Sequence, residues 1–140
     1  MKAIISMVMA VLFSVSLYSV NPIKVYKGNS VYSSDVICNI SNSKIYKKNS
    51  IYSSDVIYSI VDSKVYKGNS TYNSDIVMTI REGKIYKGTS VYNSDVIASV
   101  RNGKVYKGNS VYSNDVIFHF DGELTLVEFV AVWYAVNYVW

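Results

Sequence analysis

Serine, aspartate and histidine, the residue types of a hydrolytic triad, occur close together in the last third of the sequence. They are Ser110, Asp115 and His119, which is the only histidine. If Asp115 and His119 lie on one strand, four residues separate them by about 13 Å. A triad needs its members within hydrogen-bond distance of one another. We therefore expect no catalytic residue, and we do not expect an enzyme.

An aspartate recurs at the same place in a repeated unit, which raises the question of calcium binding. Calcium takes ~6–8 oxygen ligands, and one aspartate per unit supplies too few of them. Aspartate side chains also commonly hydrogen-bond nearby backbone in turns. We interpret these residues as structural turn residues and expect neither a metal nor another cofactor. They are Asp35, Asp55, Asp75, Asp95 and Asp115.

The aspartates belong to a unit that the chain repeats five times without insertion. Repetition builds a repeated surface and a quasi-linear architecture more readily than one asymmetric pocket. We divide the repeat region, residues 20–123, into copies at 24–43, 44–63, 64–83, 84–103 and 104–123.

Each copy holds two predicted strands, Lys-Val/Ile-Tyr-Lys at its start and a Val/Ile-rich segment after the aspartate. Asn102-Gly103 lies between two such strands, and this dipeptide is a strong signal for a tight hairpin turn with positive φ at both residues. The sequence predicts an all-β antiparallel meander. A β-solenoid is the alternative, because Tyr and Ser stack well in ladders. The solenoid would also stack like charges ~4.8 Å apart, which disfavours it.

One column of the second strand varies in size from copy to copy and is predicted to face the core. Cys38 in this column is interpreted as a small hydrophobic residue rather than a reactive thiol. It is the only cysteine, so the chain has no intrachain disulfide. The column holds Cys38, Tyr58, Met78, Ala98 and Phe118.

Residues 1–19 follow the layout of a secretory signal peptide, with Lys2, an apolar run and then small residues. The apolar run is shorter than the ~20 residues that a bilayer-spanning helix needs. We therefore expect a secreted protein, or one of the periplasm or cell envelope, with a retained membrane anchor as the alternative.

Residues 124–140 are predicted to form an apolar helix that caps the repeats. Thr125 and Glu128 have the spacing of a capping box, so the helix is expected from about Leu126. Its apolar residues recur at three- and four-residue spacings and predict one buried stripe. The stripe consists of Leu126, Phe129, Val130, Trp133, Val136 and Trp140.

The same segment supports a second interpretation. Val132, Tyr134, Val136 and Tyr138 alternate with other residues before the terminal Trp140. This pattern resembles the C-terminal strand signal of bacterial outer-membrane β proteins. The resemblance would imply an outer-membrane-associated protein that uses this aromatic segment.

The charge of the chain is only mildly basic, at +4, with Arg81 and Arg101 as its two arginines. A nucleic-acid reader is expected to cluster basic residues more densely, so nucleic acid is not expected as a partner. Tyrosine and lysine instead alternate once per repeat and predict a binding ribbon for sugar faces or anionic polymers. The ribbon consists of Tyr26, Lys27, Tyr46, Lys47, Tyr66, Lys67, Tyr86, Lys87, Tyr106 and Lys107.

The layout of the repeats resembles two known repeat families. Tyr26-Lys27-Gly28 and its equivalents at residues 66, 86 and 106 resemble the Tyr-x-Gly hairpins of MORN repeats. The period with its aromatic residues is similar to bacterial cell-wall-binding repeats. These resemblances imply attachment to a membrane or to a cell wall.

Taken together, the sequence predicts a structural or polymer-binding module of the cell envelope. A cell-wall polymer or another anionic polysaccharide is the expected partner, and membrane association is not favoured. A protein–protein interaction module is an alternative function. Exposed sheet edges also offer a route to self-association.

Overall fold

The computed structural model describes residues 7–8 and 22–139, to which all structural statements below refer. Within them, one antiparallel sheet runs in sequence order from β1 to β11, and its two edges remain unjoined. The predicted meander is therefore confirmed. The strands are β1 (Met7–Val8), β2 (Ile23–Tyr26), β3 (Val36–Ser41), β4 (Lys44–Lys47), β5 (Val56–Val61), β6 (Lys64–Lys67), β7 (Ile76–Arg81), β8 (Lys84–Lys87), β9 (Val96–Arg101), β10 (Lys104–Lys107) and β11 (Val116–His119).

Tight two-residue turns connect one repeat to the next. Asn102 and Gly103 have φ values of 50° and 73°, as the hairpin prediction requires. The turn carbonyl of Gly103 accepts a hydrogen bond from the amide of Phe120, 2.8 Å away. The equivalent turns at 42–43, 62–63 and 82–83 also have positive φ at both residues. Each turn reverses the chain, which gives a meander and not the solenoid alternative.

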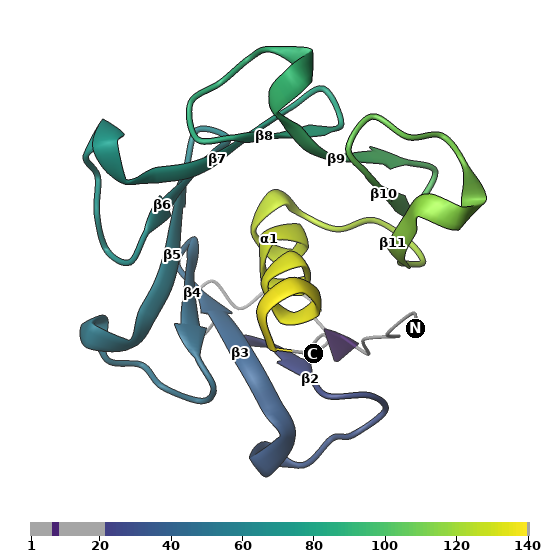
Figure 1. The fold of residues 1–140 in the computed structure, drawn as a ribbon. Coiled ribbons are helices and arrows are strands. Elements are labelled where there is room, and N and C mark those ends of the chain that lie inside the picture. The colour runs from purple at the N-terminus through teal and green to yellow at the C-terminus, as the bar shows by residue number, and fades with distance from the viewer. Residues whose placement is uncertain (1–6, 9–21, 140) are drawn as a thin grey trace.

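Longer loops connect the two strands inside each repeat. We call them tip loops and define them as residues 28–35, 48–55, 68–75, 88–95 and 108–115. They project outward from the sheet (Figure 1). Each ends in a short 3-10 turn, and these turns are η1 (Ser33–Asp35), η2 (Ser53–Asp55), η3 (Asn73–Asp75), η4 (Asn93–Asp95) and η5 (Ser113–Asp115).

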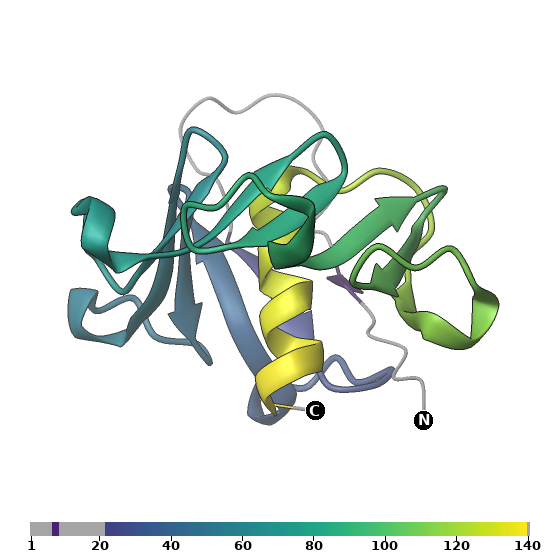
Figure 2. The same cartoon turned by 45° about the horizontal axis from the view of Figure 1, so that its top comes forward.

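The sheet curves around a C-terminal helix, α1 (Leu126–Tyr134), followed by a π-helical turn, η6 (Ala135–Val139). Figure 1 looks down the helix and shows the hairpins arranged about it, and Figure 2 shows it from the side. In every repeat the strand pairing shifts by one residue, as between Val25 and Tyr26. Such bulges bend a strand and increase its twist, which helps a sheet to curve.

The predicted capping box is present at the start of α1. The Thr125 side chain accepts a hydrogen bond from the Glu128 amide, and the Glu128 carboxylate accepts one from the Thr125 amide at 2.8 Å. Residues 132–138 are helical. The alternative interpretation of this segment as an alternating strand is therefore wrong. None of the helices formed by residues 22–139 has the length and apolarity needed to cross a membrane.

Helix α1 is buried on nearly all sides, whereas the sequence predicts a single buried stripe. Ala131 and Val132 lie outside that stripe and are nevertheless buried, and Glu128 is buried with them. The reason is that the curved sheet surrounds the helix instead of lying beneath one of its faces. A helix enclosed in this way is expected to be apolar all round.

The core forms between α1 and the inward-facing residues of the strands. The predicted core column faces the helix. The Cys38 thiol lies 3.8 Å from the Ala131 carbonyl oxygen, and the Phe118 and Phe129 rings lie 6.1 Å apart. Most of the predicted signal peptide, residues 1–19, lies outside the described residues, although Met7 and Val8 form β1.

Candidate binding surface

The tyrosines of the predicted binding ribbon are placed on the strands and are largely covered. Tyr66, Tyr86 and Tyr106 are 6–9% exposed, and Tyr26 and Tyr46 are half-buried. The lysines of the same ribbon are exposed. The structure therefore exposes the charges of this ribbon, while neighbouring side chains cover most of its aromatic surface.

The strand register explains why three of these rings are buried. Tyr106 pairs with Ser99, so Arg101 is its diagonal neighbour on the same face of the hairpin. The Arg101 guanidinium lies over the Tyr106 ring, 5.1 Å from its centroid. The residue diagonal to half-buried Tyr46 is the much shorter Ser41. This signal was available in the sequence once the hairpin register had been assigned.

A second column of tyrosines, which the ribbon prediction left out, lies in the tip loops and is exposed. Its side chains are between 70% and 73% exposed. An exposed Val or Ile precedes the tyrosine in four of the five loops, and Thr71 takes that place in the third. These tyrosines are Tyr32, Tyr52, Tyr72, Tyr92 and Tyr112.

A serine and an aspartate hold each tip loop in the same shape. In the fourth loop the Ser90 hydroxyl donates to an Asp95 carboxylate oxygen at 2.6 Å and accepts from the Tyr92 amide at 3.1 Å. The Asp95 amide in turn donates to the Tyr92 carbonyl at 2.9 Å. Equivalent bonds occur in all five loops. The aspartates interpreted as turn residues therefore lie in these loops and orient the neighbouring tyrosine.

Hydrogen bonds also join each tip loop to the repeats beside it. The side-chain amide of Asn69 donates to the backbone carbonyl of Ser53 at 2.9 Å, and equivalent bonds start from the side chains of Asn49 and Asn109. Position 89 holds a threonine instead. The Ser99 hydroxyl donates to the Gly108 carbonyl at 2.7 Å. Ser99 is partly buried and secures the following loop.

The triad residue types do not assemble into a catalytic group. The Ser110 hydroxyl donates to Asp115 at 2.5 Å, and the same Ser-Asp bond occurs in each of the other repeats, which contain no histidine. His119 is exposed at the end of β11, where it pairs with Lys104. The Ser-Asp contact is thus a structural element of the repeat.

No group of three or more His, Cys, Asp or Glu side chains within residues 7–8 and 22–139 is arranged to hold a metal ion. In each tip loop one oxygen of the aspartate already accepts from the serine hydroxyl. The tip loops that contain these aspartates project separately around the sheet (Figure 1).

Two side chains beside α1, buried Cys38 and half-buried Tyr58, have raised pKa values. Burial raises the pKa of the Cys38 thiol to about 12, which keeps the thiol protonated and suppresses nucleophilic reactivity. Burial, with Tyr138 and Tyr134 as smaller causes, raises the pKa of Tyr58 to about 12. The Tyr58 and Tyr134 rings pack edge to face with their centroids 5.9 Å apart. Both side chains pack in or against the core beside α1.

Comparison with known proteins adds a family assignment. Residues 12–133 match the model of a family described as 6-fold beta flower protein. The match includes all five repeats and most of α1. Neither a curated protein nor a solved structure gives a significant match.

Proposed function

Because this chain belongs to the 6-fold beta flower family, a family of repeat proteins and not of enzymes, we propose that it is a secreted, non-enzymatic binding module. Its ligand is an anionic polysaccharide of the cell envelope. The binding surface consists of the five tip loops, whose tyrosines replace the buried strand tyrosines as the aromatic contacts.

The observation that carries this proposal is the fivefold repetition of one exposed tyrosine in one fixed loop. The ring of Tyr92 is 71% exposed, yet hydrogen bonds through Ser90 and Asp95 hold the backbone that carries it. Exposed apolar side chains that recur on one surface are typical of interaction sites. Because the backbone that carries the ring is already fixed, little loop conformational entropy is lost when a ligand binds.

The chemistry of the tip loops suits sugars. A tyrosine ring offers an apolar face to the C–H groups of a sugar and a hydroxyl that can hydrogen-bond. The exposed lysines Lys47, Lys67, Lys87 and Lys107 each directly precede a tip loop and supply positive charge for an acidic polymer. Each contact is weak, but five of them on one chain add through effective concentration.

The test is co-sedimentation of the purified protein with peptidoglycan and with an acidic polysaccharide at low and high salt. We expect pelleting that weakens at high salt, because exposed charges are screened. Changing Tyr32, Tyr52, Tyr72, Tyr92 and Tyr112 together to Ala should abolish pelleting while circular dichroism stays unchanged. When the five tyrosines are removed one at a time, the affinity for the polymer should fall with each removal, and the fall should become steeper.

A matched control changes exposed polar residues of the same loops. Ser34, Ser54, Ser74 and Ser94 are exposed, and their replacement by Ala should leave pelleting intact. Pelleting that survives loss of all five exposed tyrosines would contradict the proposed surface. No pelleting with either polymer would reject the polysaccharide ligand and leave a protein partner as the function to test.

Secretion rests on the sequence of residues 1–19 and has its own test. Mass spectrometry of the protein recovered from its native cells should give a mature chain that lacks this segment. Recovery of the full-length chain would contradict cleavage and support a retained anchor.

A further inference from the structure

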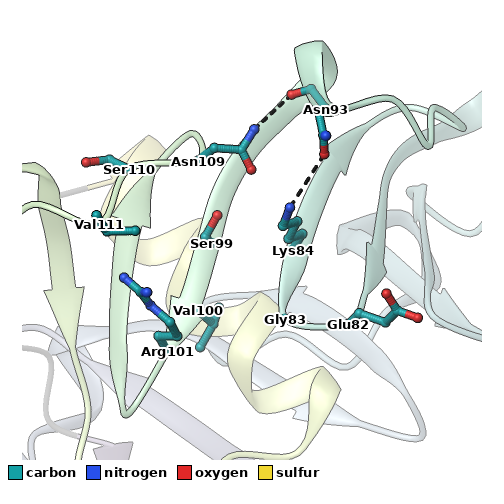
Figure 3. Close-up of a pocket in the computed structure, with 10 residues that line it drawn as sticks. All are labelled: Glu82, Gly83, Lys84, Asn93, Ser99, Val100, Arg101, Asn109, Ser110 and Val111. Atoms are coloured by element: carbon teal, nitrogen blue, oxygen red, sulfur yellow. Dashed lines mark hydrogen bonds between the residues drawn. The ribbon is translucent and has the colours of Figure 1, made fainter.

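A hollow of about 470 Å³ lies between the fourth and fifth repeats (Figure 3). We call it the junction hollow. This volume falls within the ~300–1,000 Å³ typical of small-molecule pockets. Its polar lining includes Lys84 from β8, Ser99 and Arg101 from β9, Asn93 from the fourth tip loop, and Asn109 and Ser110 from the fifth.

Two cations of the junction hollow lie close to neighbouring side chains. The Arg101 side chain packs over the Tyr106 ring at 5.1 Å from the centroid. The Lys84 ammonium lies 3.5 Å from the Asn93 side-chain oxygen. Ser99 lies between these cations, on the floor of the hollow (Figure 3). Packing over the Tyr106 ring restricts the Arg101 side chain, which therefore loses less side-chain entropy when an anion binds.

Neutral hydrogen-bonding groups complete the hollow. The Asn109 amide nitrogen donates to the Asn93 carbonyl at 3.0 Å, and its amide oxygen turns toward the hollow (Figure 3). The Ser110 hydroxyl is engaged with Asp115 and can still accept a further bond. Glu82 is the acidic residue of the lining, and it points away from the cations (Figure 3). The lining therefore has an excess of positive charge.

We propose that the junction hollow binds one acidic sugar residue of the polysaccharide. The planar guanidinium of Arg101 matches a carboxylate in a two-bond arrangement, and Lys84 supplies a second positive charge. Asn109 and Ser110 face the sugar hydroxyls. This inference rests on the proposed function for its ligand class, but it concerns a different surface from the tip-loop tyrosines.

The repeats do not reproduce this lining at every junction, so the acidic site occurs once. The place of Arg101 is taken by Ser41 in the first repeat and by Val61 in the second. The junction of the third and fourth repeats keeps the cation as Arg81 but has Thr89 in the place of Asn109. That junction is an internal control, and it also has Thr79 in the place of Ser99.

The experiment is an NMR titration of the full chain with galacturonate, galactose and sulfate at constant ionic strength. We expect galacturonate to shift the amide signals of Ser99, Arg101, Asn109 and Ser110. Galactose should leave them unchanged, and sulfate should bind at least tenfold more weakly than galacturonate. Shifts spread over all five tip loops, or equal affinity for sulfate and galacturonate, would overturn an acidic-sugar site.

Variants sharpen the assignment. Arg101→Met should weaken galacturonate binding at least tenfold, because it removes the carboxylate partner and keeps an aliphatic side chain over Tyr106. Arg81→Met is the matched control and should have no effect. Thr89→Asn should produce a second set of shifted signals around Arg81. An unchanged affinity in Arg101→Met would overturn the proposal, and no second set would overturn the role of the Asn109 amide.

The two proposals can fail separately. The variant without the five tip-loop tyrosines should lose polymer pelleting and keep galacturonate binding in the junction hollow. If galacturonate does not bind while the polymer still pellets through the tip loops, the acidic-sugar site is wrong and the proposed function stands. If galacturonate binds in the hollow but polymer pelleting does not depend on the tip-loop tyrosines, the hollow is a sugar site and the tip-loop surface is wrong.

Discussion

Two columns of tyrosine run through the five repeats with the same period and reach opposite environments. The strand tyrosines Tyr66, Tyr86 and Tyr106 are 6–9% exposed, and the tip-loop tyrosines are 70–73% exposed. Both columns hold tyrosine in every copy. Repetition shows that a position matters in each unit, but it does not distinguish a ring that is needed for packing from a ring that is presented to solvent.

Cross-strand neighbours create the difference. A strand tyrosine faces side chains of the previous repeat, as Tyr106 faces Ser99 and has Arg101 across it. A tip-loop tyrosine has no paired strand beside it, and its contacts with Ser90 in the fourth loop run through its backbone. Hydrogen bonds fix the backbone of the tip-loop tyrosine, and its ring is exposed to solvent. Substitutions in the two columns should therefore affect different properties.

The largest contrast is expected between Tyr86→Ala and Tyr92→Ala. Removing the buried ring should lower the free energy of unfolding by about 3–5 kcal/mol, as for other large buried aromatics. Removing the exposed ring should change it by less than about 0.5 kcal/mol. Urea denaturation followed by circular dichroism measures both. Equal losses would show that the tip-loop ring also packs, and the division between the columns would fail.

A smaller loss is expected from Ser90→Ala, which acts on the frame of a presented tyrosine. The variant removes the donor to Asp95 and the acceptor for the Tyr92 amide. Leaving partly buried partners unsatisfied should cost about 1–3 kcal/mol. Ser94→Ala in the same loop is the control and should cost almost nothing. The two stabilities are compared by urea denaturation, and a Ser90 effect no larger than the control would contradict the framing role.

Tyr58 extends the comparison to alkaline pH, because its ring is partly covered by α1. Its pKa is raised from 10.0 to about 12, mainly by burial. Below pH 10 the folded and unfolded states both keep the proton. Between pH 10 and 12 the unfolded state loses it first, so the free energy of unfolding falls as pH rises. The fall should be shallower in Tyr58→Phe.

The measurement is urea denaturation of the wild type and Tyr58→Phe at several pH values. From pH 6 to 8 the two proteins should show parallel behaviour. Cys38, whose pKa is also raised to about 12, adds a fall of the same sign in both proteins. Identical slopes above pH 10 would mean that the Tyr58 hydroxyl is accessible to solvent.

Much of the architecture was predictable because local signals agree with the global fold. Asn102-Gly103 predicts the hairpin turn, Thr125 with Glu128 predicts the helix start, and Cys38 marks the core column. The enclosure of α1 was not predictable in the same way. It depends on the curvature of the whole sheet, which accumulates over many bulged pairs and has no signature in the helix sequence.

The candidate site was predicted less well than the fold. The ribbon hypothesis chose Tyr86 over Tyr92 because Tyr86 and its equivalents lie beside lysine in the predicted strand of each repeat. The loop tyrosine is presented through bonds between Ser90, Asp95 and backbone amides. Such bonds arise from three-dimensional closure of the loop. The sequence shows their residue types and does not show which side chain the closure leaves exposed.

The smallest expected effect tests whether neighbouring tip loops support one another. Asn69 joins the third loop to the second through the Ser53 carbonyl, and Thr89 stands at the equivalent place in the fourth. Asn69→Ala should lower stability by about 0.5–1 kcal/mol, near the lower end for a single hydrogen bond because the contact is exposed. Thr89→Asn should raise it by a similar amount, with Ser74→Ala as a neutral control. If urea denaturation shows a lower free energy of unfolding for Asn69→Ala and a higher one for Thr89→Asn, the hydrogen-bonded frame that presents the tyrosines extends between repeats. No change in either variant would mean that each loop holds its tyrosine alone, in which case the loops bind as independent units and gain affinity only through their number.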